Sequence, residues 1–245
     1  MCKPNNENKI VRNLKGQALK NYKSKLSLNK TQKEVIIGTL LGDASISLNS
    51  GKPIYSIKFE QSIKHKGYVE DLYKLFEPYV GTSPTERFSD TVNTKLAIWF
   101  RTYNHDHFKF YYDLFYDIKI DINGNNKGIK KVPKNIQHYL TDRAVAYWFM
   151  DDGSYNDNDG SYNDNDGERD FLFHTQGFEK SDVEILIAAL KNKFNIIAST
   201  RKDGKYIVLA IKRSSTPTLL NLIKPYIHPD FFYKFSDIQK KSLGM

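Results

Sequence analysis

Two short stretches of the chain are apolar on almost every side and end in an acidic residue. The first, IIGTLLGDA, covers residues 36–44, and the second, AVAYWFMDDG, covers residues 144–153. A helix without a polar face has to be buried, so both stretches are expected at the centre of the fold. Their carboxylates, Asp43 and Asp152, lie 109 positions apart. This recurrence predicts two copies of one unit whose helices meet at one place.

Electrostatics indicate what two such helix ends are for. The C-terminal end of a helix carries a partial negative charge and unpaired carbonyls, so acids there are unfavourable as purely structural residues. Asp43 and Asp152 would raise one another's pKa unless a cation lay between them. Mg²⁺ binds through one or two carboxylates, with water and phosphate oxygens completing its shell. The pattern therefore favours metal-assisted hydrolysis of a phosphodiester.

Composition narrows the choice of partner. The 245 residues include 16 Tyr and 15 Phe, enough for a substantial core. The net charge of +9 and a pI near 9.3 favour a polyanion. An anionic membrane is the other candidate, but no apolar run is long enough to span one, and no signal peptide is visible. Cys2 is the only cysteine, which excludes disulfides and cysteine-rich zinc sites.

The order helix, hairpin, helix, hairpin, helix occurs twice, which indicates an internal duplication. We predict an α+β fold of two pseudo-symmetric αββαββα units, each with a four-stranded antiparallel sheet, packed about a central helix pair as a saddle. The predicted segments are a basic tail over residues 1–29, a first repeat over 30–120, a connector over 121–135, a second repeat over 136–236 and a tail over 237–245. The basic tail is either a solvated tail or frayed helix, or an arm lying on nucleic acid phosphates.

Local signals mark the two central helices. Thr31 and Glu34 have the spacing of a capping box ahead of the first, and Thr141 is placed to cap the second. Gly38 and Gly42 lie four residues apart, on one side of the first helix. Small residues at that spacing are expected to allow close approach of a partner helix.

A tandem repeat breaks the symmetry of the two halves. The heptapeptide SYNDNDG occurs at residues 154–160 and again at 161–167. We interpret the second copy as an insertion in a hairpin loop. A calcium loop is the alternative, but tyrosines, Tyr155 and Tyr162, stand where its first acidic ligand belongs.

One face of each sheet is expected to cover helices and the other to face a ligand. Two-stranded ribbons fit the DNA major groove and read base edges there. Basic residues on the hairpins of both halves are therefore predicted to contact DNA, although any one of them alone is an ordinary surface charge. These are Lys52, Lys58, Arg87, Lys95 and Arg101 in the first half and Arg201, Lys202, Lys205, Lys212 and Arg213 in the second.

The two acid-tipped helices resemble those of the LAGLIDADG homing endonucleases, in the single-chain form with two motifs. The family's last acidic position falls on Asp43 and Asp152, and its closing glycine falls on Ala44 and Gly153. Its early glycine, a helix-contact position, falls on Gly38 in the first copy, while the second copy has Tyr147 there. The resemblance extends across residues 30–236.

The resemblance also implies roles for other residues. Gln61 and Gln176 resemble the family's active-site glutamine, and Lys130 and Lys234 its active-site lysines, with Lys131 as an alternative to Lys130. The backbone carbonyls of Gly42 and Asp151 are expected as additional metal ligands. The histidines at 105, 107 and 174 suggest another nuclease chemistry, but no cysteine cluster or paired-histidine helix supports it.

The resemblance implies a monomeric, sequence-specific DNA endonuclease that cuts both strands across the minor groove with Mg²⁺, or Mn²⁺ as a substitute, and promotes intron mobility. The alternative is a maturase, which binds its host group I intron RNA and assists splicing. The carboxylate pair favours the enzyme, because binding RNA does not require it. Lys, Asn, Ile, Tyr and Phe have AT-rich codons, and their abundance suggests an organellar genome, mitochondrial or chloroplast.

Overall fold

The computed structural model describes residues 14–49, 52–89, 91, 94–155 and 171–244, without the side chains of residues 48, 49, 52, 53, 242 and 243. The chain divides into two compact units. The first holds residues 1–33, 43–113 and 118–128, and the second holds residues 34–42, 114–117 and 129–245. Most of the first apolar run therefore packs within the second unit. Residues 156–167, which are most of the SYNDNDG repeats, lie outside the described part of the chain.

Each unit contains a four-stranded antiparallel sheet with the same strand order, which confirms the predicted fold class. The first sheet has the order β1-β2-β4-β3 and the second has the order β7-β8-β10-β9. The strands are β1 (Ser45–Asn49), β2 (Lys52–Ser62), β3 (Thr85–Phe88), β4 (Lys95–Arg101), β7 (Gly153–Tyr155), β8 (Phe171–Phe173), β9 (Ala198–Asp203) and β10 (Tyr206–Ile211).

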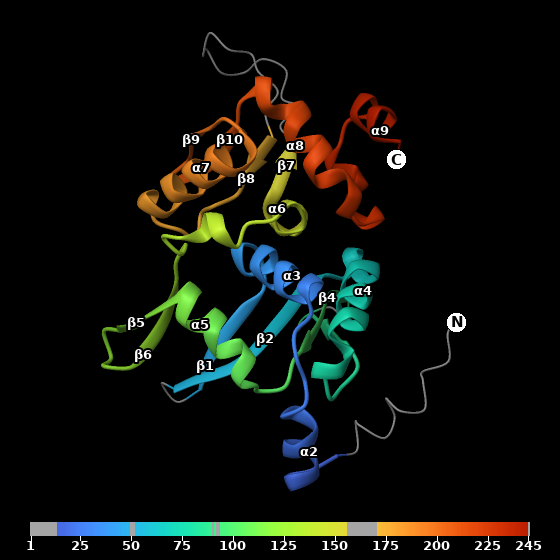
Figure 1. The fold of residues 1–245 in the computed structure, drawn as a ribbon, viewed down its shortest axis with the longest axis vertical. Helices are drawn as coiled ribbons and strands as arrows, with labels where there is room; N and C mark the ends of the chain where they lie inside the picture. The colour runs from blue at the N-terminus through green and yellow to red at the C-terminus, as the bar shows by residue number, and fades with distance from the viewer. Residues whose placement is uncertain (1–13, 50–51, 90, 92–93, 156–170, 245) are drawn as a thin grey trace. The chain divides into compact units, whose positions relative to one another are not determined.

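Helices cover one face of each sheet, as Figure 1 shows for α4 (Lys66–Phe76) on β2 and β4 and for α7 (Lys180–Phe194) on β9 and β10. The other helices are α2 (Gly16–Lys23), α3 (Lys30–Leu41), α5 (Lys109–Phe115), α6 (Asp142–Asp152), α8 (Thr216–Ile223) and α9 (Asp237–Leu243). Short 3₁₀ turns are η1 (Ile63–His65), η2 (Glu77–Tyr79), η3 (Asp106–Phe108), η4 (Ile136–His138), η5 (Arg213–Ser215), η6 (Lys224–Tyr226) and η7 (Pro229–Lys234). None of the described helices is both long and apolar enough to cross a bilayer.

Aromatic residues build the core of each unit. In the first, Phe59 of β2 stacks on Phe76 of α4 at 5.0 Å and on Phe100 of β4 at 4.9 Å between ring centroids. In the second, Trp148 of α6 lies 4.1 Å from Phe173 of β8. Because successive strand residues face opposite sides, these contacts show which face of each sheet meets the helices.

Of the two predicted helix caps, one needs correction and the other is confirmed. The predicted capping box of Thr31 and Glu34 is wrong, because α3 begins earlier and is capped by Asn29 and Gln32, which exchange side-chain to backbone hydrogen bonds of 2.9 and 3.0 Å. Glu34 instead binds Arg143 of α6. Thr141 caps α6 as predicted, since its hydroxyl accepts from the Ala144 amide.

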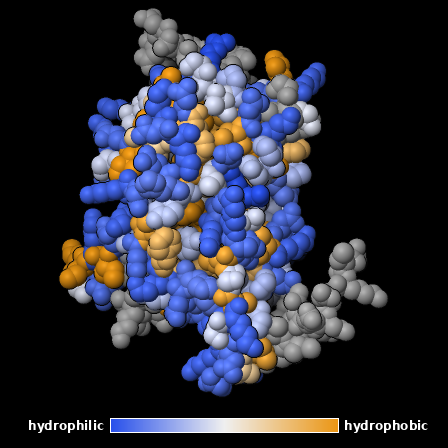
Figure 2. All heavy atoms as spheres, viewed as in Figure 1, coloured by the Kyte–Doolittle hydropathy of each residue, from blue (hydrophilic) through white to orange (hydrophobic). Residues whose placement is uncertain are grey.

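Regular structure also occurs where the sequence indicated tails and a loop. α2 and α9 lie in the predicted tails. β5 (Tyr116–Ile120), at the end of the predicted first repeat, pairs with β6 (Asn126–Lys130) in the predicted connector to form a hairpin. Ile118, Ile120 and Ile122 are exposed on this hairpin, whose hydrophobic surface is visible at the left edge of Figure 2. Its asparagines and glycines favoured a loop, whereas the two strands pair with one another, and Lys131 N donates to Phe115 O at 2.8 Å where the hairpin joins the rest of the chain.

Candidate functional site

The site is built on the contact between α6 and the part of α3 that belongs to the same unit. A Cβ atom at Gly38 would lie 2.3 Å from the carbonyl oxygen of Ala144 and 2.8 Å from Cβ of Tyr147. A Cβ atom at Gly42 would lie 2.4 Å from Cβ of Asp151. Only glycine fits at either position, which confirms the predicted close approach of a partner helix.

Lysine side chains lie at the C-terminal ends of both helices. The Lys130 ammonium donates to the carbonyl of Gly42 at 2.7 Å, just beyond the end of α3. The Lys234 ammonium donates to the carbonyls of Met150 at 2.6 Å and Phe149 at 3.3 Å, in the last turn of α6. The Phe149 carbonyl also accepts from the Gly153 amide, whereas the carbonyls that follow it at the helix end lack the usual partner within the helix. A cation there offsets the negative end of the helix dipole. Both lysines predicted for the site therefore lie at helix ends.

In the first unit, Asp43 and Gln61 are brought together. The Gln61 amide donates to Oδ2 of Asp43 at 2.7 Å, and Oε1 of Gln61 lies 3.4 Å from Nδ1 of His65. Asp43 itself is exposed. The amide fixes the orientation of the carboxylate at the start of the chain that leads from α3 into β1.

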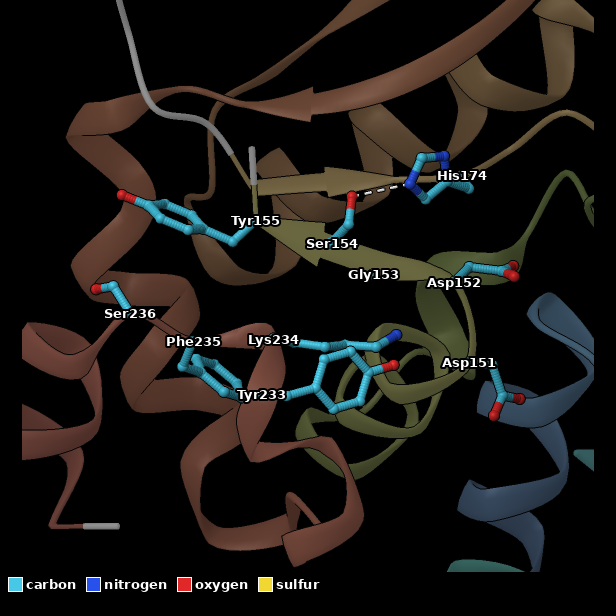
Figure 3. Close-up of a pocket in the computed structure, with 10 residues that line it drawn as sticks. All are labelled: Asp151, Asp152, Gly153, Ser154, Tyr155, His174, Tyr233, Lys234, Phe235 and Ser236. Carbon is cyan, nitrogen blue, oxygen red and sulfur yellow. Dashed lines mark hydrogen bonds between the residues drawn. The ribbon is translucent and has the colours of Figure 1, made fainter. Parts of the chain in front are cut away.

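In the second unit, Asp152 lines a cavity of about 480 Å³. Figure 3 shows Asp151 and Asp152 at one side of it and Lys234 and Tyr233 below the strand that carries Ser154. Gly153 begins that strand, and a Cβ atom there would lie 2.2 Å from Cδ2 of Phe149. The glycine that closes the second motif is thus required by packing.

Gln176 does not reach Asp152. Its side-chain amide bonds Nδ1 of His174 at 3.2 Å and Oδ2 of Asp203 at 3.3 Å. The ends of the two strands explain this. Gln61 lies within β2, two positions after the core residue Phe59, whereas β8 ends at Phe173 and Gln176 lies in the turn that follows it.

His174 also lines the cavity, although the sequence did not lead us to place it beside Asp152. Its Nε2 lies 2.8 Å from the Ser154 hydroxyl (Figure 3), and its backbone amide donates to the carbonyl of Asp152 at 2.9 Å. Burial lowers the pKa of the imidazole, with an opposing contribution from Asp203 and a reinforcing one from Lys234. One feature of the sequence could have identified it. His174 directly follows the strand FLF, and Glu60 directly follows IKF at the equivalent place in the first half.

In the first sheet, the predicted DNA contacts at Lys58, Arg87 and Lys95 are held by carboxylates. Lys58 and Arg87 both bind Glu60, and Lys95 binds Glu86 at 2.6 Å. Arg101 lies 3.4 Å from the Ser56 hydroxyl. The side chain of Lys52 lies outside the described part of the chain.

In the second sheet, the predicted basic residues divide between the faces of the strands. Arg201 pairs with Val208 and Lys202 pairs with Ile207. Leu209 shares the helix-covered face with Phe173, so Ile207 and Lys202 lie on that face and Arg201 lies on the open one. The register therefore favours Arg201 over Lys202 as a DNA contact. Lys205, Lys212 and Arg213 are exposed.

The donor set suits a hard divalent cation. No group of three or more His, Cys, Asp or Glu side chains within the described ranges is arranged to hold a metal by itself. A cation bound through Asp43 or Asp152 would complete its shell with water and phosphate oxygens, as Mg²⁺ does. The carbonyl of Gly42, predicted as a further ligand, accepts from Lys130 and retains one lone pair.

Comparisons with known proteins agree with this arrangement. The sequence model of the LAGLIDADG DNA endonuclease family matches residues 33–219. Probable intron-encoded endonuclease 1 of Wickerhamomyces canadensis is 34% identical over 219 residues, which cover 88% of this chain and 89% of the relative. Cytochrome b mRNA maturase bI2 of Saccharomyces cerevisiae is 28% identical over 241 residues, covering 95% of this chain and 54% of the relative. The solved structure of the homing endonuclease I-WcaI bound to its DNA recognition sequence matches with a TM-score of 0.72 and 30% identity, covering 93% of this chain and 96% of that one.

Proposed function

Because the chain belongs to the LAGLIDADG DNA endonuclease family, we propose that it is a sequence-specific homing endonuclease that cuts both strands of DNA across the minor groove. The observation that carries the proposal is the repeated construction at the ends of α3 and α6. Each end receives a lysine ammonium on its terminal carbonyls and is followed or closed by an aspartate. That construction gathers cationic donors and carboxylates where a phosphate and a metal ion both have to bind.

Asp43 and Asp152 are the proposed metal-binding carboxylates, with the carbonyls of Gly42 and Asp151 as supporting ligands. The contact between Gly42 and Asp151, their chain neighbours, supports this choice. When bound, Mg²⁺ supplies activation of water and stabilisation of charge on the phosphate oxygens; Mn²⁺ is the expected substitute.

The surrounding side chains orient the metal-binding carboxylates and neutralise charge on the phosphate. The Gln61 amide holds the Asp43 carboxylate in one orientation. Lys130 and Lys234 carry positive charge beside the cavity and the helix ends, where it stabilises charge that develops on a cleaved phosphate. Gln176 acts through His174, to which it is bonded, rather than on Asp152 directly.

The open faces of the two sheets are the proposed DNA-reading surfaces. Arg87, Arg101 and Arg201 lie there, and the +9 net charge supports attraction to a polyanion. Two halves with different side chains suit a long, asymmetric target read by a monomer. The proposal includes an intron-encoded, organellar origin, supported by the AT-rich codons of the abundant residues.

A maturase is the second candidate, favoured by the similarity to the yeast cytochrome b mRNA maturase. The chain spans about half the length of that relative. Binding of a group I intron RNA without cleavage of DNA would identify this function.

The test is cleavage of a randomised DNA library by the full chain, with Mg²⁺, with Mn²⁺ and with a chelator. Asp43→Asn and Asp152→Asn serve as paired variants. We expect double-strand cuts at one long sequence with either metal only, and none from either variant. Cutting that persists in either variant would contradict the metal assignment, and splicing assistance without any cutting would favour the maturase.

A further inference from the structure

A carboxylate lies in the middle of the open face of the first sheet. Glu60 of β2 pairs with Trp99 of β4, which pairs in turn with Thr85 of β3. Paired residues share a face, and Phe59 faces the helices, so this row lies on the opposite, open side. Polyanionic DNA docked on this face would meet a negative charge.

The carboxylate is bound by two of the cations predicted to contact DNA. Oε1 of Glu60 accepts from Nε of Arg87 at 3.0 Å, and Oε2 accepts from the Lys58 ammonium. The Lys58 ammonium also lies 5.3 Å from the centroid of the Trp99 ring. Glu60 and Lys58 are about three-quarters buried by these contacts, at 24% and 29% side-chain exposure. The contacts of this cluster therefore form without DNA.

Glu60 remains ionised at neutral pH. Burial raises the pKa of its carboxyl group, but the hydrogen bonds from Lys58 and Arg87 outweigh burial and hold it below the usual value. An ionised carboxylate on this face costs affinity for every DNA sequence, because it repels phosphates and occupies two cations that would otherwise neutralise them. Such a cost is expected where the carboxylate discriminates among sequences.

The second sheet is built differently at the corresponding place. His174 follows Phe173 as Glu60 follows Phe59, and it bonds Ser154 rather than a cation. Arg201, on the open face of that sheet, makes no salt bridge within the described part of the chain. A carboxylate held between two cations is therefore described in the first sheet, whereas Asp203 on β9 of the second sheet accepts a hydrogen bond from Gln176.

We propose that Glu60 is a specificity-determining residue of the first sheet, where its carboxylate accepts a hydrogen bond from the exocyclic amino group of a cytosine in the major groove. A carboxylate is the natural acceptor for cytosine N4. Arg87 and Lys58, aligned by the same carboxylate, are then presented to neighbouring acceptors. A base without a donor at that point desolvates the Glu60 carboxylate without giving it a further hydrogen bond, which lowers the affinity for that sequence. The proposal rests on the DNA-binding role assigned to the sheets above.

The test compares cleavage preferences of the full chain and of Glu60→Gln, Glu60→Ala and Glu70→Gln over one randomised library. Glu70 on α4 is the matched control, because it makes a longer ion pair of 4.0 Å with Lys66, on the helix-bearing side of the sheet. Thermal denaturation verifies that each variant is folded.

We expect Glu60→Gln to lose a cytosine preference of about ten-fold at one position in one half-site and to prefer adenine there, since glutamine pairs with adenine N6 and N7. Glu60→Ala loses the preference without gaining another, and both variants bind unrelated duplex more tightly than the native chain. An unchanged preference profile, or a change that Glu70→Gln shares, would overturn the assignment of Glu60. If the native chain selects no DNA sequence at all, the proposed function fails together with it, so the two failures are distinguishable.

Discussion

The contact between α3 and α6 makes Gly38→Ala a demanding test of the structure. A methyl group at this position would lie 2.3 Å from the carbonyl oxygen of Ala144 and 2.8 Å from Cβ of Tyr147. The first of these atoms belongs to backbone, so no rotamer change relieves the clash. The helices would have to separate by roughly 1 Å, because dispersion contacts between such atoms are optimal near 3.5 Å.

The magnitude follows from two opposing effects. Overpacking a buried contact costs about 1–3 kcal/mol, and a rigid backbone clash belongs in the upper part of that range. Replacing glycine by alanine inside a helix stabilises the folded state by about 1 kcal/mol, because alanine has the higher helix propensity. The net loss is about 1–2 kcal/mol, which lowers the Tm by about 2–8 °C for a domain of this size.

The assay is thermal unfolding followed by calorimetry, with Gly177→Ala as the control. A Cβ atom at Gly177 meets no atom within 4 Å, so this variant is expected to stay within about 0.5 kcal/mol of the native chain. A Gly38→Ala protein with an unchanged or raised Tm would refute the reasoning, since it would mean that the two helices do not touch at this residue.

The remaining predictions concern activity. Asp43→Asn and Asp152→Asn are each expected to reduce cleavage by at least about a hundred-fold while DNA affinity is largely retained; parallel loss of binding would point to a folding defect instead. The logarithm of DNA affinity should fall linearly with the logarithm of salt concentration, and Arg201→Gln should reduce that slope by about one; a flat salt response would exclude phosphate contacts by the sheets. Deletion of residues 161–167 should leave cleavage nearly unchanged, because it removes one copy of a tandem repeat, and an inactive product would show that the loop is functional.

Much of the fold follows from local sequence pattern. The all-apolar runs predicted buried helices, and in α6 every residue from Ala144 to Met150 except Tyr147 is fully buried. Alternation and turn residues predicted the two hairpins of each half, and the strand orders confirm four-stranded antiparallel sheets. These predictions succeed because burial of a helix face or a strand face imposes a periodicity that is written in consecutive residues.

Other features depend on which distant groups come together. The sequence alone determined that the chain makes two acid-ended buried helices, two antiparallel sheets and a basic surface, since composition and periodicity suffice for these. Only the tertiary structure decided that Gln61 binds Asp43 while Gln176 turns to His174, that Asn29 rather than Thr31 caps α3, and that Glu60 holds Lys58 and Arg87. A one-residue difference in register reverses the face of a strand residue. The sequence also offers each of these polar side chains several possible hydrogen-bond partners. The choice among them is made by long-range packing, which no local pattern records.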